Sequence, residues 1–317
     1  MEQKAVETRQ PVATGYVTSG SLQIYYERRG DPSHPPVLLL MGAGCQLSLW
    51  PQPLLQGLLE SGFQLVLMDN RDIGLSSRVK AAANPSVATH LVRYLLGLPG
   101  KAHYSLHDLV DDCRVLLDHL GLSSVHLLGY SMGGMVAQLL SAAYPERIRS
   151  LNLLMSGSNH PRLMSPSWRV IREVLRASQP TDNEGLCQRS FNFWKCIESP
   201  GWPADPELLW QQVKSDLQRG YDPDGFERQL LAIFATGSLR SWLCRIKAPT
   251  LVLHGTADPL IPCRAGRDSA RHIPEARFES IEQMGHDFPP ELLPRLHALL
   301  FTHLQQVETG QKHPTRG

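Results

Sequence analysis

The fold is decided by the stretch Leu127-Leu128-Gly129-Tyr130-Ser131-Met132-Gly133-Gly134. It joins two apolar runs, Val125 to Leu128 and Met135 to Leu140. The first run is short and flanked by loop residues, which is typical of a buried parallel strand. The second contains small residues and stops before Pro145, which predicts a helix packed closely on a sheet. The stretch therefore predicts a strand, a tight turn at Ser131 and a helix.

A serine held between two glycines in such a turn has a specific chemical use. The turn is tight enough that bulky neighbours would clash, which explains Gly129 and Gly133. It also lifts the Ser131 hydroxyl to a helix N-terminus, where backbone N–H groups and the helix dipole favour negative charge. Gly-x-Ser-x-Gly alone occurs by chance in roughly one chain of this size in ten. The flanking strand and helix favour a nucleophilic Ser131 over an incidental one.

Composition limits the classes of protein to which the chain can belong. It has 317 residues, 42% hydrophobic and 19% charged, enough for one globular core plus an insertion. The net charge is +1 without a basic run, which argues against nucleic acid or a membrane surface as partner. No apolar stretch reaches about 18 residues, and the polar N-terminus does not resemble a signal peptide. Six dispersed cysteines indicate reduced thiols in a cytoplasmic protein, and a disulfide between Cys187 and Cys196 is the alternative.

Apolar runs alternate with helix-like segments along most of the chain. Residues 15–17 and 22–28 alternate at period two around a turn, which predicts an antiparallel hairpin. The continuous apolar run 37–41 predicts a central parallel strand, and further strands are expected at 64–68, 125–128, 148–155, 249–255 and 277–281. Helical segments between or after them are expected at 50–59, 106–120, 135–143, 263–272 and 290–306. The pattern predicts an α/β fold with a doubly wound, mostly parallel eight-stranded sheet.

The alternation breaks between about residues 159 and 246. This segment is mostly helical and holds five of the six tryptophans. We expect most of its aromatic side chains to form a small core and a minority to line an apolar pocket, as in a lid. The predicted domains are therefore an α/β core at 13–158 and 247–306 and a helical cap at 159–246, with flexible tails at 1–12 and 307–317.

A serine nucleophile needs a general base, normally histidine, and that histidine needs an acid to orient it. In a parallel sheet the ligand site lies beyond the carboxyl ends of the strands. Of thirteen histidines, only His254 and His286 are well placed for such a site. His286 lies in the loop after the last strand, free to point at the strand ends, and is the favoured base. His254 ends the preceding strand and is the alternative.

The favoured acid is Asp258. It follows the penultimate strand in a turn, Gly255 to Pro262, that two prolines make rigid. A turn-forming role alone is the competing interpretation. Asp287 is the other carboxylate nearby, but it is adjacent to His286, and neighbouring side chains rarely meet in the geometry required.

With these residues identified, the sequence resembles the α/β-hydrolase superfamily over roughly residues 15–306. The turn around Ser131, the Asp258 turn and the Gly285-His286 loop match the family in order and spacing. The resemblance implies that Ser131 is the nucleophile, His286 the base and Asp258 the acid.

The resemblance also implies an oxyanion hole made by the backbone N–H groups of Ala43 and Met132. Both assignments are physically reasonable, because Met132 begins a helix and the glycines flanking Ala43 let the backbone approach a substrate oxygen. Two positions depart from the family pattern. Met41 stands where many members carry histidine, and Asp72 replaces a glycine in the loop 69–74.

With these two departures, the sequence resembles the branch of the family that contains aclacinomycin methylesterase. This resemblance implies cleavage of a methyl or other small alkyl ester of a bulky apolar molecule. We therefore predict a serine hydrolase that cleaves the carboxylic ester of a small apolar molecule through an acyl-enzyme. The alternatives on the same three residues are a C–C bond hydrolase, a lactone hydrolase or a cofactor-free perhydrolase. A small-molecule receptor without turnover is the alternative from another class. No metal and no cofactor are expected, because metal-ligand spacing and a dinucleotide fingerprint are both missing from the sequence.

Overall fold

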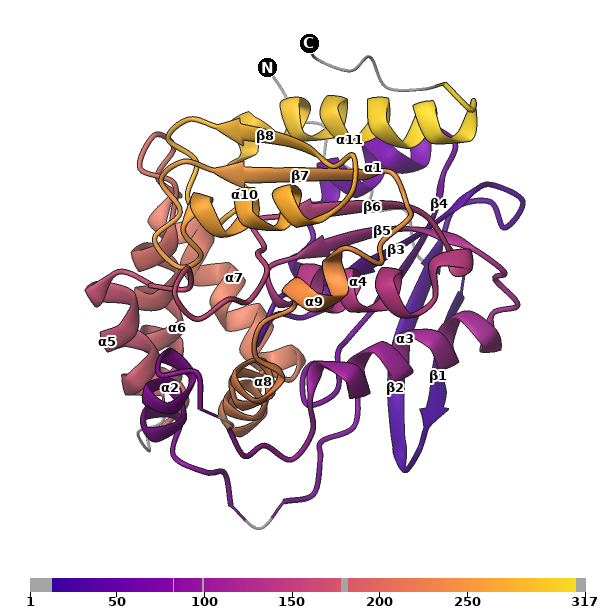
Figure 1. Ribbon diagram of the computed structural model, residues 1–317. Coiled ribbons are helices and arrows are strands. Elements are labelled where there is room, and N and C mark those ends of the chain that lie inside the picture. Colours follow the sequence, from indigo (N-terminus) through magenta and orange to yellow (C-terminus); the bar gives the residue numbers. More distant parts are fainter. Residues whose placement is uncertain (1–12, 82, 99, 178–181, 312–317) are drawn as a thin grey trace.

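The computed structural model describes residues 13–81, 83–98, 100–177 and 182–311, and an eight-stranded sheet runs through its centre (Figure 1). The strands are β1 (Ala13–Ser19), β2 (Leu22–Arg29), β3 (Pro36–Leu40), β4 (Gln64–Met68), β5 (Val125–Tyr130), β6 (Ile148–Leu154), β7 (Thr250–Gly255) and β8 (Arg277–Ile281). Their order is β1-β2-β4-β3-β5-β6-β7-β8. The pairs β1–β2 and β2–β4 are antiparallel and all later pairs are parallel. The predicted mostly parallel sheet is confirmed.

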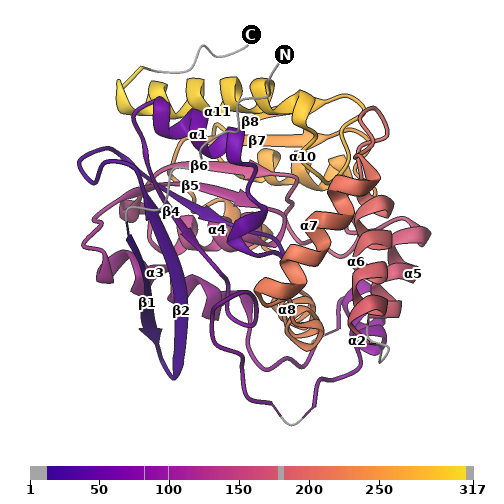
Figure 2. The ribbon, with the colours of Figure 1, turned by 180° about the vertical axis from the view of Figure 1, so that it is seen from behind.

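Helices cover both faces of the sheet. One face carries α1 (Gln52–Glu60) and α11 (Leu293–Glu308), and the other carries α3 (Leu106–His119), α4 (Met132–Ala143) and α10 (Cys263–His272) (Figures 1 and 2). Successive strand side chains point to opposite faces. In β3, Leu38 and Leu40 join the core beneath α3 and α4, while Val37 and Leu39 join the core beneath α1 and α11. This two-sided burial explains why the strand reads as a continuous apolar run.

The insertion between β6 and β7 contains five helices among the described residues. They are α5 (Trp168–Ala177), α6 (Asn183–Ile197), α7 (Pro206–Arg219), α8 (Pro223–Thr236) and the short α9 (Arg240–Leu243). Helices α5 to α8 gather beyond the carboxyl ends of the parallel strands (Figures 1 and 2). The 3₁₀ helices η1 (Leu47–Leu49), η2 (Pro145–Arg147) and η3 (Pro290–Leu292) lie in the core connections.

Helix α2 (Val87–Leu95) lies with the insertion, although its sequence position placed it in the predicted core domain. It packs on α8, and the rings of Tyr94 and Phe234 lie 5.2 Å apart. The group of helices beyond the strand ends is therefore assembled from two separate parts of the chain. We refer to α2 and α5–α8 together as the cap.

At the C-terminal end, the last helix extends into the predicted tail. Helix α11 continues to Glu308, two residues into the predicted tail at 307–317. The Glu308 carboxylate lies 2.9 Å from Arg149 Nη1 and 3.0 Å from His126 Nε2, so this helix end is held by the core. Residues 1–12 and 312–317 lie outside the described residues.

Two further predictions concern cysteines and membranes. All six cysteines lie within the described ranges and are free thiols, so Cys187 and Cys196 form no bridge. Among the helices of the described residues, none combines the length and apolar character needed to cross a membrane.

Candidate active site

Ser131 lies at the predicted turn between β5 and α4 and adopts an unusual backbone conformation. Its φ of 54° and ψ of −120° fall in a region that non-glycine residues rarely occupy. The Ser131 N–H donates to the Leu154 carbonyl at 3.0 Å, and its own carbonyl accepts the Ser156 hydroxyl at 2.7 Å. These bonds to the end of β6 and the residues after it hold the turn, so the Ser131 hydroxyl projects beyond the sheet.

The glycines around Ser131 are required by close backbone approach. A Cβ atom at Gly129 would lie 2.6 Å from the Gly133 carbonyl oxygen. A Cβ atom at Gly133 would lie 2.1 Å from the carbonyl oxygen of Leu40 in β3. Both distances are too short for any side chain, so these glycines let the first turn of α4 rest directly on the strands.

The structure brings the three predicted residues together. His286 Nε2 lies 3.0 Å from Ser131 Oγ, and His286 Nδ1 lies 2.6 Å from Asp258 Oδ2. The His286 backbone is fixed on both sides: its N–H donates to the Ile197 carbonyl at 2.8 Å, and its carbonyl accepts the Tyr130 hydroxyl at 2.7 Å. Because Ile197 ends α6, the cap helps to place the histidine.

Asp258 is buried and held as a carboxylate. Its Oδ1 accepts the backbone N–H groups of Leu260 at 2.9 Å and Ile261 at 2.8 Å, while Oδ2 faces His286. Burial opposes its charge, but the neighbouring His286 and His254 outweigh that effect and lower the pKa of Asp258 to about 2. Asp287 is turned away, because it accepts a hydrogen bond from Ser199.

His254, the alternative base, lies behind Asp258 rather than beside Ser131. Its Nε2 is 2.8 Å from the Ile261 carbonyl oxygen and 3.2 Å from Asp258 Oδ2. Its ring packs against α10, where a Cβ atom at Gly266 would lie 2.3 Å from Nδ1. His254 therefore supports the turn that carries Asp258, as expected of a hydrogen-bonded residue at a strand end.

The predicted oxyanion donors flank the serine. Met132 is the first residue of α4, where a backbone N–H has no partner within the helix. On the other side, a Cβ atom at Gly42 would lie 3.1 Å from Ser131 Cβ, so the loop that carries Ala43 passes directly by the hydroxyl. Asn70 Nδ2 donates to the Met41 carbonyl at 3.0 Å and holds the start of this loop.

A cavity of about 930 Å³, a volume that includes its open mouth, adjoins Ser131 and His286 and is lined by residues of both the core and the cap. The aromatic side chains that face it from the insertion are Phe193, Trp194, Phe226 and Phe234, whereas Trp168 is 73% exposed. Helix α2 adds Leu91 and Tyr94. Among the described residues that line it there is no Asp, Glu, Lys or Arg, so the cavity suits an uncharged molecule.

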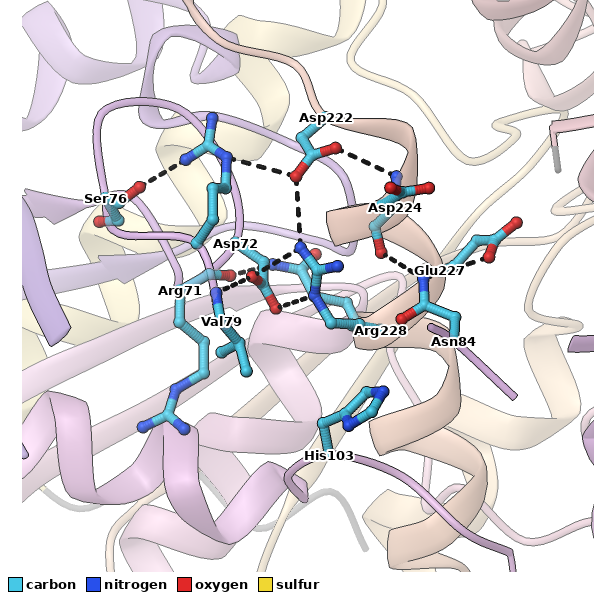
Figure 3. Close-up of polar contacts among 12 residues, drawn as sticks. Arg71, Asp72, Ser76, Val79, Asn84, His103, Asp222, Asp224, Glu227 and Arg228 are labelled. Atoms are coloured by element: carbon cyan, nitrogen blue, oxygen red, sulfur yellow. Dashed lines mark hydrogen bonds and ion pairs between the residues drawn. The ribbon is translucent and has the colours of Figure 1, made fainter. Parts of the chain in front are cut away.

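Asp72, which replaces the family's glycine, has a φ of 73°, a conformation that glycine adopts without cost. Its carboxylate accepts Arg228 Nε and Nη2 from α8, both at 2.9 Å, and the Val79 N–H at 2.6 Å (Figure 3). Arg228 Nη2 also lies 3.3 Å from Asp222 Oδ2. This ion pair joins the cap to the loop after β4, and it could not be seen in the local sequence.

The fold and this arrangement of side chains define an α/β hydrolase. The family model described as alpha/beta hydrolase fold matches residues 35–291, so the chain belongs to that family, as the sequence predicted.

Particular relatives cover almost the whole chain. Rhodomycin D methylesterase DnrP of Streptomyces peucetius is 25% identical over 309 residues, covering 92% of this chain and 97% of that protein. Poly(3-hydroxyalkanoate) depolymerase of Ectopseudomonas oleovorans is 28% identical and covers 90% of each chain. The enol-lactonase structure from Burkholderia xenovorans LB400 superposes with a TM-score of 0.72 at 21% identity, over 92% of this chain and 100% of that one. A methylesterase among the relatives agrees with the predicted branch.

Proposed function

We propose that this α/β hydrolase is a serine hydrolase that cleaves a carboxylic ester of a small apolar molecule through an acyl-enzyme. The observation that carries the proposal is the continuous hydrogen-bonded series from Ser131 Oγ to His286, 3.0 Å, and from His286 to Asp258, 2.6 Å. Ser131 and His286 line an apolar cavity, where a substrate carbonyl would meet the hydroxyl.

In the proposed mechanism, Ser131 Oγ attacks the ester carbonyl while His286 Nε2 accepts the hydroxyl proton. The N–H groups of Ala43 and Met132 stabilise the resulting oxyanion, and each is worth about 3 kcal/mol of transition-state stabilisation. His286 then donates its proton to the departing alcohol, and water repeats the sequence on the acyl-enzyme. Asp258 stays ionised at neutral pH, because its pKa is about 2, and stabilises the imidazolium.

The substrate class follows from the cavity walls. An uncharged lining dominated by Met, Leu, Ile and aromatic side chains favours a neutral, bulky body. The methylesterase relatives support a methyl or other small alkyl ester as the reacting group. We further infer that residues 159–246, together with α2, form a cap that shields the acyl-enzyme from bulk water.

Two measurements test this function. A chromogenic 4-nitrophenyl ester should give a burst of one alcohol per enzyme, and a fluorophosphonate should label Ser131 and no other residue. Ser131→Ala is the matched control and should abolish both signals. Full esterase activity in Ser131→Ala would contradict the proposal, and an unlabelled, inactive wild-type protein would favour the receptor alternative.

A panel of substrates then separates the reactions open to the same three residues. Methyl esters of bulky hydrophobic acids should be cleaved with higher kcat/KM than lactones, short acyl esters or C–C bond substrates. A preference for lactones would instead favour the activity named for a curated relative, 3-oxoadipate enol-lactonase 2 of Acinetobacter baylyi.

A further inference from the structure

Two adjacent residues of helix α8 form hydrogen bonds with different parts of the core. Arg228 pairs with Asp72 in the loop after β4 (Figure 3). Gln229, the next residue, is fully buried and reaches the loop between β3 and η1. That loop contains Ala43, one of the proposed oxyanion donors. The contact made by Gln229 therefore joins the cap to the loop whose backbone would face the substrate.

Both ends of the Gln229 amide are satisfied. Its Oε1 accepts the Gly44 N–H at 2.7 Å, and its Nε2 donates to the Arg71 carbonyl at 2.7 Å. Only the amide oxygen can accept an N–H and only the amide nitrogen can donate to a carbonyl, so the two partners fix the orientation of the side chain. Leaving either end unpaired in this buried position would be unfavourable, which makes the conformation rigid.

The Gly44 contact fixes the peptide that follows Ala43. On the other side of Ala43, Asn70 holds the Met41 carbonyl at 3.0 Å. Gly44 has a φ of 71°, and a Cβ atom there would lie 2.7 Å from Phe226 Cδ2, so α8 packs directly on this turn. Hydrogen bonds thus fix the loop on both sides of Ala43: Asn70 binds Met41 before it, and Gln229 binds Gly44 after it.

We propose that Gln229 is a positioning residue for the oxyanion hole, holding Gly44 so that the Ala43 N–H faces the substrate carbonyl oxygen. This inference rests on the proposed serine hydrolase function. It assigns α8 to the rigid frame of the active site, although the sequence placed that helix in a lid. Gln229 touches no substrate itself and acts through the backbone of the 42–44 loop.

The test replaces Gln229 with a side chain of similar length that forms neither bond. Gln229→Met should lower kcat for a 4-nitrophenyl ester by roughly tenfold to a hundredfold, because small misplacements of catalytic groups cost this much. KM should change by less than about threefold, since ground-state contacts are kept. Affinity for phenylboronic acid, whose serine adduct places an oxygen in the hole, should fall by the same factor as kcat/KM.

The matched control breaks the neighbouring contact and leaves Gln229 intact. The double variant Asp72→Gly with Arg228→Met removes both charges and should keep kcat within about threefold of wild type. Thermal unfolding identifies the folded variants, and Gln229→Leu repeats the test if Gln229→Met does not fold.

If a folded Gln229 variant keeps the wild-type kcat and boronate affinity, the positioning role of Gln229 is overturned, but the proposed function is not. The same holds if the double variant loses as much kcat as the Gln229 variant. A wild-type enzyme without Ser131-dependent esterase activity would instead overturn the proposed function.

Discussion

Arg228→Met should strongly destabilise the folded chain, although Arg228 lies outside the sheet. The guanidinium and the Asp72 carboxylate form two parallel hydrogen bonds of 2.9 Å, and their side chains are 8% and 0% exposed. Removing the cation leaves a buried carboxylate with one backbone donor, Val79 N–H. Breaking a buried pair in this way typically costs about 3–5 kcal/mol of the free energy of unfolding.

Replacing the other partner should cost less. In Asp72→Gly, Arg228 keeps Asp222, which lies 3.3 Å away with a side chain 25% exposed, so the cation retains a partner near solvent. Glycine also adopts the left-handed backbone conformation at φ 73° without strain, which should return about 1 kcal/mol to the free energy of unfolding. We expect a net loss of about 1–3 kcal/mol. The double variant leaves neither charge unpaired, so it should be more stable than Arg228→Met alone.

The free energy of unfolding, measured by urea titration with circular dichroism, tests this double-mutant cycle. Arg149→Met is the matched control, because its pair with Glu308 has side chains 33% and 29% exposed and should be worth under about 1 kcal/mol. The reasoning is wrong if Arg228→Met costs no more than this control. It is equally wrong if the two single losses simply add in the double variant, since the charges would then be energetically independent.

Three further outcomes follow from the site and its surroundings. Asp258→Asn should lower kcat about 10³- to 10⁴-fold while the fold persists, because His286 loses the partner that sets its tautomer; steady-state kinetics and circular dichroism check this. Burial raises the pKa of Asp216 to about 7, so the folded chain should lose stability as the pH rises from about 4 to 7. Asp216→Asn should match wild type near pH 4 and exceed it at pH 8, and equal stabilities at pH 8 would refute the assignment. Leu230→Trp, which fills part of the cavity, should lower kcat/KM for bulky esters more than for acetate esters, as a substrate series would show.

The sheet and the three central residues were predictable because their signals are local. Leu38 and Leu40 face one side and Val37 and Leu39 the other, so burial on both faces appears as an uninterrupted apolar run. The glycines around Ser131 appear as a motif because backbone atoms touch at those positions. His286 follows the last strand, and a parallel topology alone brings that loop to the serine.

The features that could not be predicted from the sequence depend on contacts between segments that lie far apart in the chain. Nothing in the sequence of residues 87–95 shows that helix α2 packs on α8, because these two segments lie far apart in the chain. Asp72 was recognisable as a departure from glycine, yet its partner Arg228 lies 156 residues away. Gln229 had no local signal at all, because a polar residue in a helix usually faces solvent and only the tertiary structure buries this one.

Helix α8 joins substrate selection to catalysis because its residues face two different parts of the site. Phe226, Leu230, Ile233 and Phe234 line the cavity, at the spacing of one helix face. Gln229, between them in sequence, holds Gly44 in the proposed oxyanion loop. A displacement of α8 by a poorly fitting substrate would therefore move the loop as well as the cavity wall. Substitutions in the cavity wall of α5 should accordingly change KM alone, whereas comparable substitutions in α8 should change kcat too.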